Sequence, residues 1–355
     1  MRKREIGMIA CAALLILLLS WGIYGRQSAE ADYTDEIDYV IGVSQANMRE
    51  SWRLALIQEL QQEAEKYENI KIITTDATSD IEKQEKDVDK LIDYGIDLLI
   101  ISPCDSKRMT EKVKEVYQEE IPVIVMDRAV EGFDYSLFIG PDNHLIGEQG
   151  GECVKQILDG RRGHVLELCS APNTIQSRER SEGFWEALSD APRIEKTTVK
   201  LKESMKDSAF DTILAMGQDL RNTDVIFANN DAVAYGAYEA LREMGMEEEI
   251  LIVGCDGYTG MDEGVDLVRK GRLAATISCP TGGKEAIQYA INILNQDSGV
   301  PKQVILRSHT ITKENADEYL AGLSKEYTDD GQEIVMGFAQ VGQESAFRLA
   351  NTQPS

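Results

Sequence analysis

Short apolar runs of β type alternate with helical segments from residue 39 to about residue 307, and this alternation constrains the fold most strongly. The candidate strands are residues 40–43, 70–74, 98–101, 123–126, 136–139, 164–169, 197–201, 225–228, 251–255, 274–277 and 304–307. Apolar residues recur at steps of three and four in the segments between them, such as 81–94 and 109–118. Strands separated by helices of this length predict βαβ units with mostly parallel sheets. Because so many strands exceed one open sheet, we expect two Rossmann-like lobes.

The stretch at residues 40–55 predicts a ligand-binding edge. It reads as a buried strand that breaks into a polar loop at Ser44 and Gln45, and then opens a helix that carries Trp52 and Arg53. In a parallel α/β sheet, ligands sit at the carboxyl ends of the strands. An aromatic ring beside a guanidinium suits a polyol, because the ring packs on C–H faces and the guanidinium donates to hydroxyls.

Several other strand ends also carry polar side chains. Some of these must be helix N-caps, which accept hydrogen bonds from free backbone N–H groups. We assign that role to three of them: Asp105, Asn143 and Asp231. Asp127, Arg128 and Asn230 instead add charge and hydrogen-bonding capacity where a cleft between lobes is expected. An ion pair within one lobe is the alternative for Asp127 and Arg128.

Charge and motif content exclude several functions. The 355 residues carry a formal net charge of −25, which would repel the phosphates of nucleic acid. The sequence contains no nucleophile elbow, zinc-protease motif or phosphate-binding loop, so we expect neither an enzyme nor a cofactor. None of the six cysteines forms a Cys-x-x-Cys pair, so a metal site is not expected. A carbohydrate-active enzyme is retained only as the alternative, because no nucleophile–base pair can be named.

The two ends of the chain differ from the middle. Residues 6–24 are almost uncharged and follow a basic cluster at residues 2–4, which predicts a membrane anchor or a cleaved signal segment over residues 1–25. Residues 26–37 read as a polar tether. Residues 325–355 read as an acidic linker and a partial repeat of the domain start, since residues 335–350 match residues 40–55 without a gap at six of sixteen positions.

The order of the strand-end motifs resembles that of the periplasmic binding protein type I family, the ribose- and galactose-type sugar receptors. Residues 121–128 look like the family strand that ends in Asp-Arg, and residues 177–184 like its Arg-x-Arg-x-Glu-Gly-Phe helix entry. Residues 227–237 and 253–257 continue the series. The resemblance covers about residues 38–324, and residues 45–53 are similar to the opening of galactofuranose-type receptors.

The resemblance implies two lobes joined by a three-segment hinge, with a sugar clamped between them. Lobe 1 would span about 38–140 and 280–307, and lobe 2 about 141–279 and 308–324. The implied ligand-binding residues are Gln45, Trp52, Arg53, Asp127, Arg128, Arg180, Asn230, Asp256 and Cys279. Trp52 would stack on the sugar, and the charged side chains would bond its hydroxyls. The family usually has Gln or an aromatic residue at Cys279 and an aromatic residue near Ser204 and Met205, so part of the usual aromatic sandwich is absent.

We therefore expect an extracytoplasmic receptor of the bacterial cell envelope that closes on a monosaccharide, a pentose or hexose in pyranose or furanose form. The receptor would be held by its N-terminal helix or secreted after signal cleavage. Its closed form would be read by a membrane partner, either an ABC permease or a sensor histidine kinase.

Overall fold

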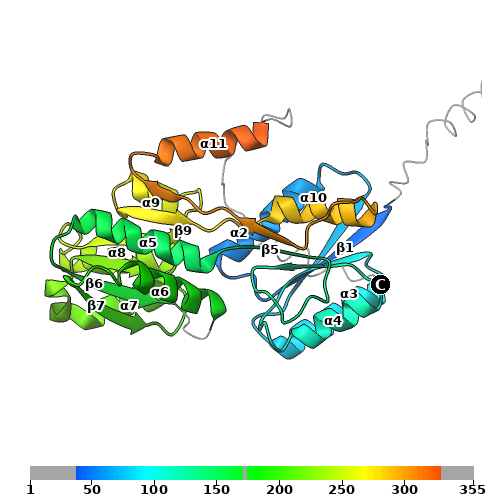
Figure 1. Cartoon of the computed structure of the whole chain (residues 1–355), viewed down its shortest axis with the longest axis horizontal. Coiled ribbons are helices and arrows are strands. Elements are labelled where there is room, and N and C mark those ends of the chain that lie inside the picture. Colours follow the sequence, from blue (N-terminus) through cyan, green and yellow to red (C-terminus); the bar gives the residue numbers. More distant parts are fainter. Residues whose placement is uncertain (1–36, 171–173, 329–355) are drawn as a thin grey trace, which may run out of the picture.

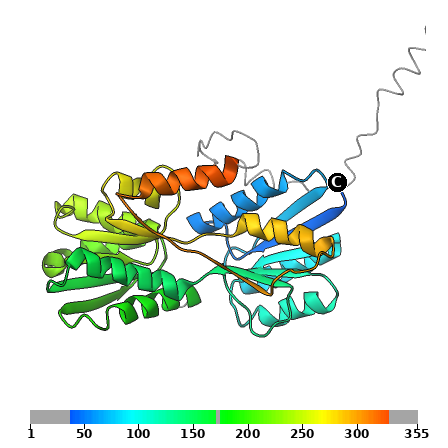
Figure 2. The same ribbon diagram turned by 45° about the horizontal axis from the view of Figure 1, so that its top comes forward.

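The computed structural model describes residues 37–170 and 174–328, which form two α/β lobes that lie side by side (Figures 1 and 2). The first sheet has the order β11-β5-β4-β3-β1-β2 and is parallel throughout. Its strands are β1 (Tyr39–Gln45), β2 (Ile70–Asp76), β3 (Leu98–Ser102), β4 (Val123–Met126), β5 (Leu137–Pro141) and β11 (Gln303–Leu306). The predicted fold class, two lobes with mostly parallel sheets, is confirmed.

The second sheet repeats this pattern with the order β12-β10-β9-β8-β6-β7. Its strands are β6 (Gly163–Cys169), β7 (Ile194–Lys200), β8 (Val225–Ala228), β9 (Leu251–Asp256), β10 (Ala275–Ser278) and β12 (Thr310–Thr312). Strand β12 pairs antiparallel with β10, whereas the other pairings are parallel. Strand β12 was not predicted from the sequence, because its three residues are one isoleucine between two threonines and form no apolar run.

Helices cover both faces of each sheet. The helices around the first sheet are α2 (Ser51–Ala64), α3 (Ile81–Tyr94), α4 (Thr110–Gln118) and α10 (Gly283–Leu294). Those around the second are α5 (Asn143–Leu158), α6 (Ile175–Ala187), α7 (Lys206–Met216), α8 (Asp231–Met244), α9 (Gly264–Arg269) and α11 (Ala316–Thr328), with a 3₁₀ turn η1 (Gly217–Asn222). Helix α11 continues past residue 325, where we place the start of the acidic linker.

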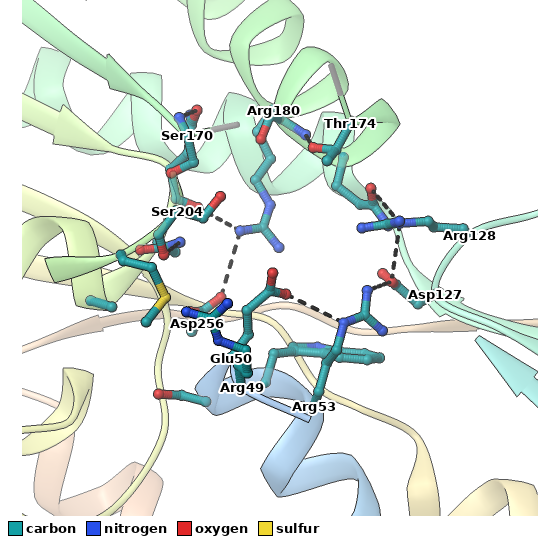
Figure 3. A pocket seen from close by; sticks show the side chains of 18 residues that line it. Arg49, Glu50, Arg53, Asp127, Arg128, Ser170, Thr174, Arg180, Ser204 and Asp256 are labelled. Atoms are coloured by element: carbon teal, nitrogen blue, oxygen red, sulfur yellow. Dashed lines mark hydrogen bonds and ion pairs between the residues drawn. The ribbon is translucent and has the colours of Figure 1, made fainter. Parts of the chain in front are cut away.

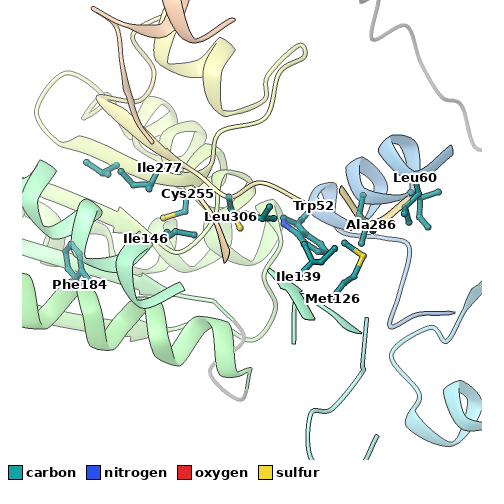
Figure 4. Packing of buried hydrophobic residues seen from close by; sticks show 14 of the residues in the cluster. Trp52, Leu60, Met126, Ile139, Ile146, Phe184, Cys255, Ile277, Ala286 and Leu306 are labelled. Carbon is teal, nitrogen blue, oxygen red and sulfur yellow. The ribbon is translucent and has the colours of Figure 1, made fainter. Parts of the chain in front are cut away.

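The alternation of side chains along β3 shows how the core forms. Leu98 and Ile100 join a cluster with residues of α2 and α10, whereas Leu99 and Ile101 join another with residues of α3 and α4. Successive side chains of a strand point to opposite faces, so a strand that is apolar throughout needs helices on both sides. The first cluster continues across the lobe junction to Phe184 and Cys255 (Figure 4).

The chain passes between the sheets three times: from β5 to α5, from β10 to α10, and from β11 to β12. Each sheet has its topological switch next to its first strand, between β1 and β3 and between β6 and β8. In open α/β sheets this switch point is where ligands bind. Both switch points therefore mark where the two lobes would hold a ligand.

The ends of the chain are not part of this description. The predicted anchor at residues 1–25, the tether as far as residue 36 and the partial repeat at 335–350 lie outside the described residues. Within residues 37–170 and 174–328, no helix is both long enough and apolar enough to cross a bilayer.

Candidate ligand-binding site

A cavity of about 150 Å³ lies between the lobes, with walls from both (Figure 3). Its lining residues are Arg49, Glu50, Ser51, Trp52, Arg53, Asp127, Arg128, Ser170, Thr174, Gln176, Ser177, Arg180, Ser204, Met205, Asn229, Asn230, Ala232 and Asp256. A water molecule takes about 30 Å³, so this volume equals roughly five waters. The cavity therefore suits one small sugar ring rather than an oligosaccharide.

Arg53 forms the centre of the first-lobe wall. It stands in the first turn of α2, and its side chain is 2% exposed. Its guanidinium donates to Ser102 Oγ at 2.7 Å and to Gln45 Oε1 at 3.5 Å, and it pairs with Asp127 Oδ2 at 3.3 Å and Glu50 Oε2 at 3.3 Å. These contacts tie the carboxyl ends of β1, β3 and β4 to one side chain, which fixes the guanidinium before any ligand arrives.

Arg128 reaches from the first lobe to the second. Its guanidinium donates to the carbonyl oxygens of Pro103 at 3.3 Å and Cys104 at 2.5 Å, and across the cleft to Gln176 Oε1 at 3.2 Å. Asp127 Oδ2 lies 3.7 Å from its Nε. The predicted alternative, an ion pair of Asp127 and Arg128 within one lobe, is thus present, yet both residues also line the cavity.

Arg180 forms the centre of the second-lobe wall. It donates to Asn143 Oδ1 at 2.9 Å, to the Asn229 carbonyl at 2.6 Å and to Cys279 Sγ at 2.9 Å, and its Nη1 lies 3.6 Å from Asp256 Oδ1. Because it joins α5, the end of β8 and the β10–α10 crossing, Arg180 is both a cavity residue and a structural brace.

A close helix crossing sets the position of Arg180. A Cβ atom on Gly147 of α5 would lie 2.1 Å from the Arg180 carbonyl oxygen, and one on Gly183 of α6 would lie 2.1 Å from the His144 carbonyl oxygen. Only glycine allows the two backbones to approach this closely. The crossing is reinforced by Phe184, which stacks on Phe227 with ring centroids 3.9 Å apart.

The two cavity aspartates end strands of different sheets in an unusual backbone conformation. Asp127 has φ +66° and Asp256 has φ +127°, a region that side-chain-bearing residues seldom adopt. Such strain concentrates at functional sites. Burial raises the pKa of Asp256 to about 7, and the positive charge of Arg180 opposes that rise.

The N-cap assignments need correction. Asn230, not Asp231, caps α8 by accepting from the Val233 N–H at 2.7 Å, because the helix begins one residue earlier than expected. Asn230 still lines the cavity, and its amide nitrogen donates to the Ser204 carbonyl at 3.2 Å. Asp231 is instead buried beside Asp256, accepting from Thr276 Oγ1 and the Gly257 N–H. Burial raises its pKa well above the usual value.

A second cap shifts in the same way. Asp142 caps α5 by accepting from the Leu145 N–H at 2.9 Å, whereas Asn143 accepts from Arg180. Asp105 accepts from the Arg108 N–H at 2.8 Å, but it lies in the turn before α4, whose N-cap position is Met109, so it does not cap a helix.

Seven of the nine predicted site residues line the cavity, and two do not. Gln45 is fully buried behind Arg53, and Cys279 lies beneath Arg180 at the β10–α10 crossing. Burial raises the pKa of the Cys279 thiol to about 12, and nearby Arg180 opposes that rise. Both residues position an arginine instead of facing the cavity. The five described cysteines are all free.

Trp52 lines the cavity and also packs in the hydrophobic cluster, with 9% of its surface exposed. Its ring lies 5.6 Å from the Arg53 guanidinium carbon. Ser204 and Met205 occupy the opposite lobe where the family resemblance leads us to expect an aromatic residue. The cavity thus has an aromatic wall on the first lobe and a polar and thioether wall on the second.

Several cavity residues were not predicted from the sequence: Arg49, Glu50, Ser170, Thr174 and Gln176. Ser170 is 2% exposed, and its hydroxyl makes no hydrogen bond to the part of the chain that the structure describes. A buried hydroxyl without a partner at a cavity wall is a ready donor and acceptor for a ligand. Its place directly after a buried strand is the signal that could have identified it.

Comparison with known proteins agrees with this architecture. A family model described as a periplasmic binding protein domain matches residues 41–298. The ribose import binding protein of Bacillus subtilis is 28% identical over 295 residues, covering 82% of this chain and 94% of that protein. The galactofuranose-binding protein of Escherichia coli is 26% identical over 281 residues, covering 76% and 86%.

A solved structure gives the same result. The fructose-binding periplasmic domain of a hybrid two-component system matches with a TM-score of 0.75 and 32% identity, covering 82% of this chain and 96% of that domain. These relatives are solute-binding proteins rather than enzymes, which agrees with the expectation for this chain. The chain belongs to the periplasmic binding protein family.

Proposed function

We propose that this protein is an extracytoplasmic receptor that binds a monosaccharide in the cavity between its lobes. The observation that carries the proposal is the cavity itself, in which Trp52 and Arg53 of one lobe face Arg180 and Asp256 of the other. Arginine and aspartate pairs offer directional donors and acceptors to hydroxyls, each worth about 1.5–3 kcal/mol when charged. The indole offers an apolar face to the C–H groups of the ring.

The proposed mechanism is a closure of the lobes about the three crossings. A ligand held by residues of both lobes stabilises the closed form, because only that form makes both sets of contacts. Two contacts already join the lobes at the cavity rim: Arg128 Nε donates to Gln176 Oε1, and Ser51 Oγ lies 3.5 Å from Glu263 Oε1. Closure thus changes the surface that a partner can recognise.

We propose a membrane partner that reads the closed form, an ABC permease or a sensor kinase. The relatives support each choice: two are binding proteins for ribose import and galactofuranose, and one is the fructose-binding periplasmic domain of a hybrid two-component system. The identity is similar in the two classes, 32% to the two-component domain and 30% to the ribose import binding protein of Escherichia coli, so both partners are kept.

The experiment is a thermal-shift screen of the purified chain against pentoses and hexoses, including sugars that populate furanose forms. A ligand at 100 times its Kd should add about 2.7 kcal/mol to the stability of the folded state. The proposal fails if no sugar raises the melting temperature and calorimetric titration with the same sugars gives no heat of binding.

A further inference from the structure

The charges of the cavity do not cancel, and this imbalance bears on the ligand. Four arginines line the cavity, Arg49, Arg53, Arg128 and Arg180, against three carboxylates, Glu50, Asp127 and Asp256. Each carboxylate lies within 4 Å of an arginine nitrogen: Glu50 and Asp127 of Arg53, and Asp256 of Arg180. Arg49 remains. Its side chain is exposed at the rim and forms no hydrogen bond or ion pair with residues 37–170 or 174–328.

The helix that begins beside Arg49 adds to this positive field. Helices α2, α6 and α8 all point their N-termini at the cavity, and the N-terminus of a helix carries partial positive charge. Side chains of Thr174 and Asn230 cap α6 and α8. Helix α2 has no side-chain cap and no acidic residue in its first turn. Its N-cap residue is Glu50, whose carboxylate pairs with Arg53 Nε at 3.3 Å instead of accepting from the first N–H groups of the helix.

An independent observation points to a polar ligand group in the same cavity. The buried Ser170 hydroxyl on the opposite lobe has no partner within the described residues, as noted above. The chain as a whole carries a net charge of −25, so the excess of positive charge is a property of the cavity lining and not of the whole molecule. At physiological ionic strength, screening acts over about 8 Å, so charges in the cavity outweigh those of the distant surface for a bound ligand.

We propose that the ligand is an acidic monosaccharide, a sugar that carries one carboxylate or phosphate, with its anionic group at the start of α2 beside Arg49. This inference rests on the proposed function and narrows it. Arg49 is then the specificity residue: a guanidinium takes a carboxylate or phosphate in paired hydrogen bonds that a neutral hydroxyl cannot reproduce. Arg53, Arg128 and Arg180 are already engaged with carboxylates and serve the hydroxyls of the sugar ring.

The test is isothermal titration calorimetry of the full chain with matched pairs of sugars: galacturonate against galactose, glucuronate against glucose, and glucose 6-phosphate against glucose. We expect one acid to bind at least tenfold more tightly than its neutral parent, with an advantage that shrinks as salt rises. A preference for the phosphate over the uronates identifies the anion as a phosphate, and the reverse identifies it as a carboxylate.

Variants assign the preference to Arg49. Arg49→Gln should reduce the ratio of acid to neutral affinity about tenfold, and Arg49→Lys should restore part of it. Arg178→Gln is the matched control, since Arg178 lies outside the cavity lining with 61% of its side chain exposed, and its ratio should equal that of the wild type. Tighter binding of a neutral sugar, or a ratio indifferent to Arg49→Gln, overturns the inference but leaves the proposed function standing. Absence of binding by every sugar, neutral or acidic, overturns both.

Discussion

The carboxyl group of Glu59 connects hinge structure to pH, and replacing it by an amide isolates that effect. Glu59 lies on α2, and its Oε2 accepts from the Thr281 hydroxyl and, at 3.1 Å, from the Gly283 N–H. Both partners belong to the segment that crosses from β10 to α10. Burial raises the pKa of Glu59 from 4.5 to about 7, and the charge of Glu285 adds to the rise, while the hydrogen bonds from Thr281 and Gly283 oppose it.

The sign follows from proton binding. Since the folded state holds the Glu59 proton more tightly than the unfolded state, the free energy of unfolding falls as pH rises from about 4.5 to about 7. Each pKa unit corresponds to about 1.4 kcal/mol, which gives an upper bound of about 3.5 kcal/mol. Glu59 also lines a second cavity and is only partly buried, so we expect about 2 kcal/mol.

Glu59→Gln keeps an oxygen that can accept both hydrogen bonds and removes the charge. Urea unfolding of both proteins should give equal stability at pH 4 and a variant that is more stable by about 2 kcal/mol at pH 8. Glu65→Gln, at an exposed position just after the same helix, is the control and should give no such pH-dependent difference. A difference between Glu59→Gln and wild type that is constant with pH, or that favours the wild type at pH 8, would refute the reasoning.

Three further predictions test the packing and the site. Gly147→Ala should lower the free energy of unfolding in urea by about 2 kcal/mol or more and weaken ligand binding, because α5 and α6 must separate and displace Arg180. Gly322→Ala, where a Cβ meets open space, is the control and should not lower it. Equal melting points for the two variants would contradict the close helix crossing. Thr276→Val should lower the free energy of unfolding by about 2 kcal/mol in urea, since it removes the hydroxyl that donates to the buried Asp231. An unchanged urea midpoint would show that this hydrogen bond is dispensable. Gln176→Ala should weaken binding of any identified sugar about two- to tenfold, because it removes the hydrogen bond from Arg128 that joins the two lobes across the cleft. Stopped-flow measurements should show the loss as faster dissociation. Slower association instead would contradict a role of this contact in holding the closed form.

Much of the fold can be predicted from the sequence, because buried parallel strands are continuous apolar runs. The runs at residues 98–101 and 225–228 correspond closely to β3 and β8. Strand β12 could not be found this way, since its edge position and antiparallel pairing depend on where the chain returns after β11. Periodicity reports burial, and a three-residue edge strand buries too little to be seen.

The site was less predictable than the fold. Sequence motifs identified the arginines and aspartates that end up around the cavity, but they could not separate residues that face it from residues one layer behind. Gln45 and Cys279 fall in the second group, because each contacts an arginine that reaches the cavity in its place. The exchange of roles between Asn230 and Asp231 has a similar origin: a helix start that moves by one residue changes which side chain caps and which is buried.

The three passages of the chain between the sheets also affect how the protein is made. Strand β11 covers the edge of the first sheet at β5, and β12 covers the edge of the second at β10, so both sheets are completed by residues 303–312. A nascent chain released before residue 303 would expose two unpaired strand edges at once, which are templates for aggregation. Neither sheet is complete until residues 303–312 have been synthesised. We therefore expect a soluble product only when translation has almost reached the end of the domain.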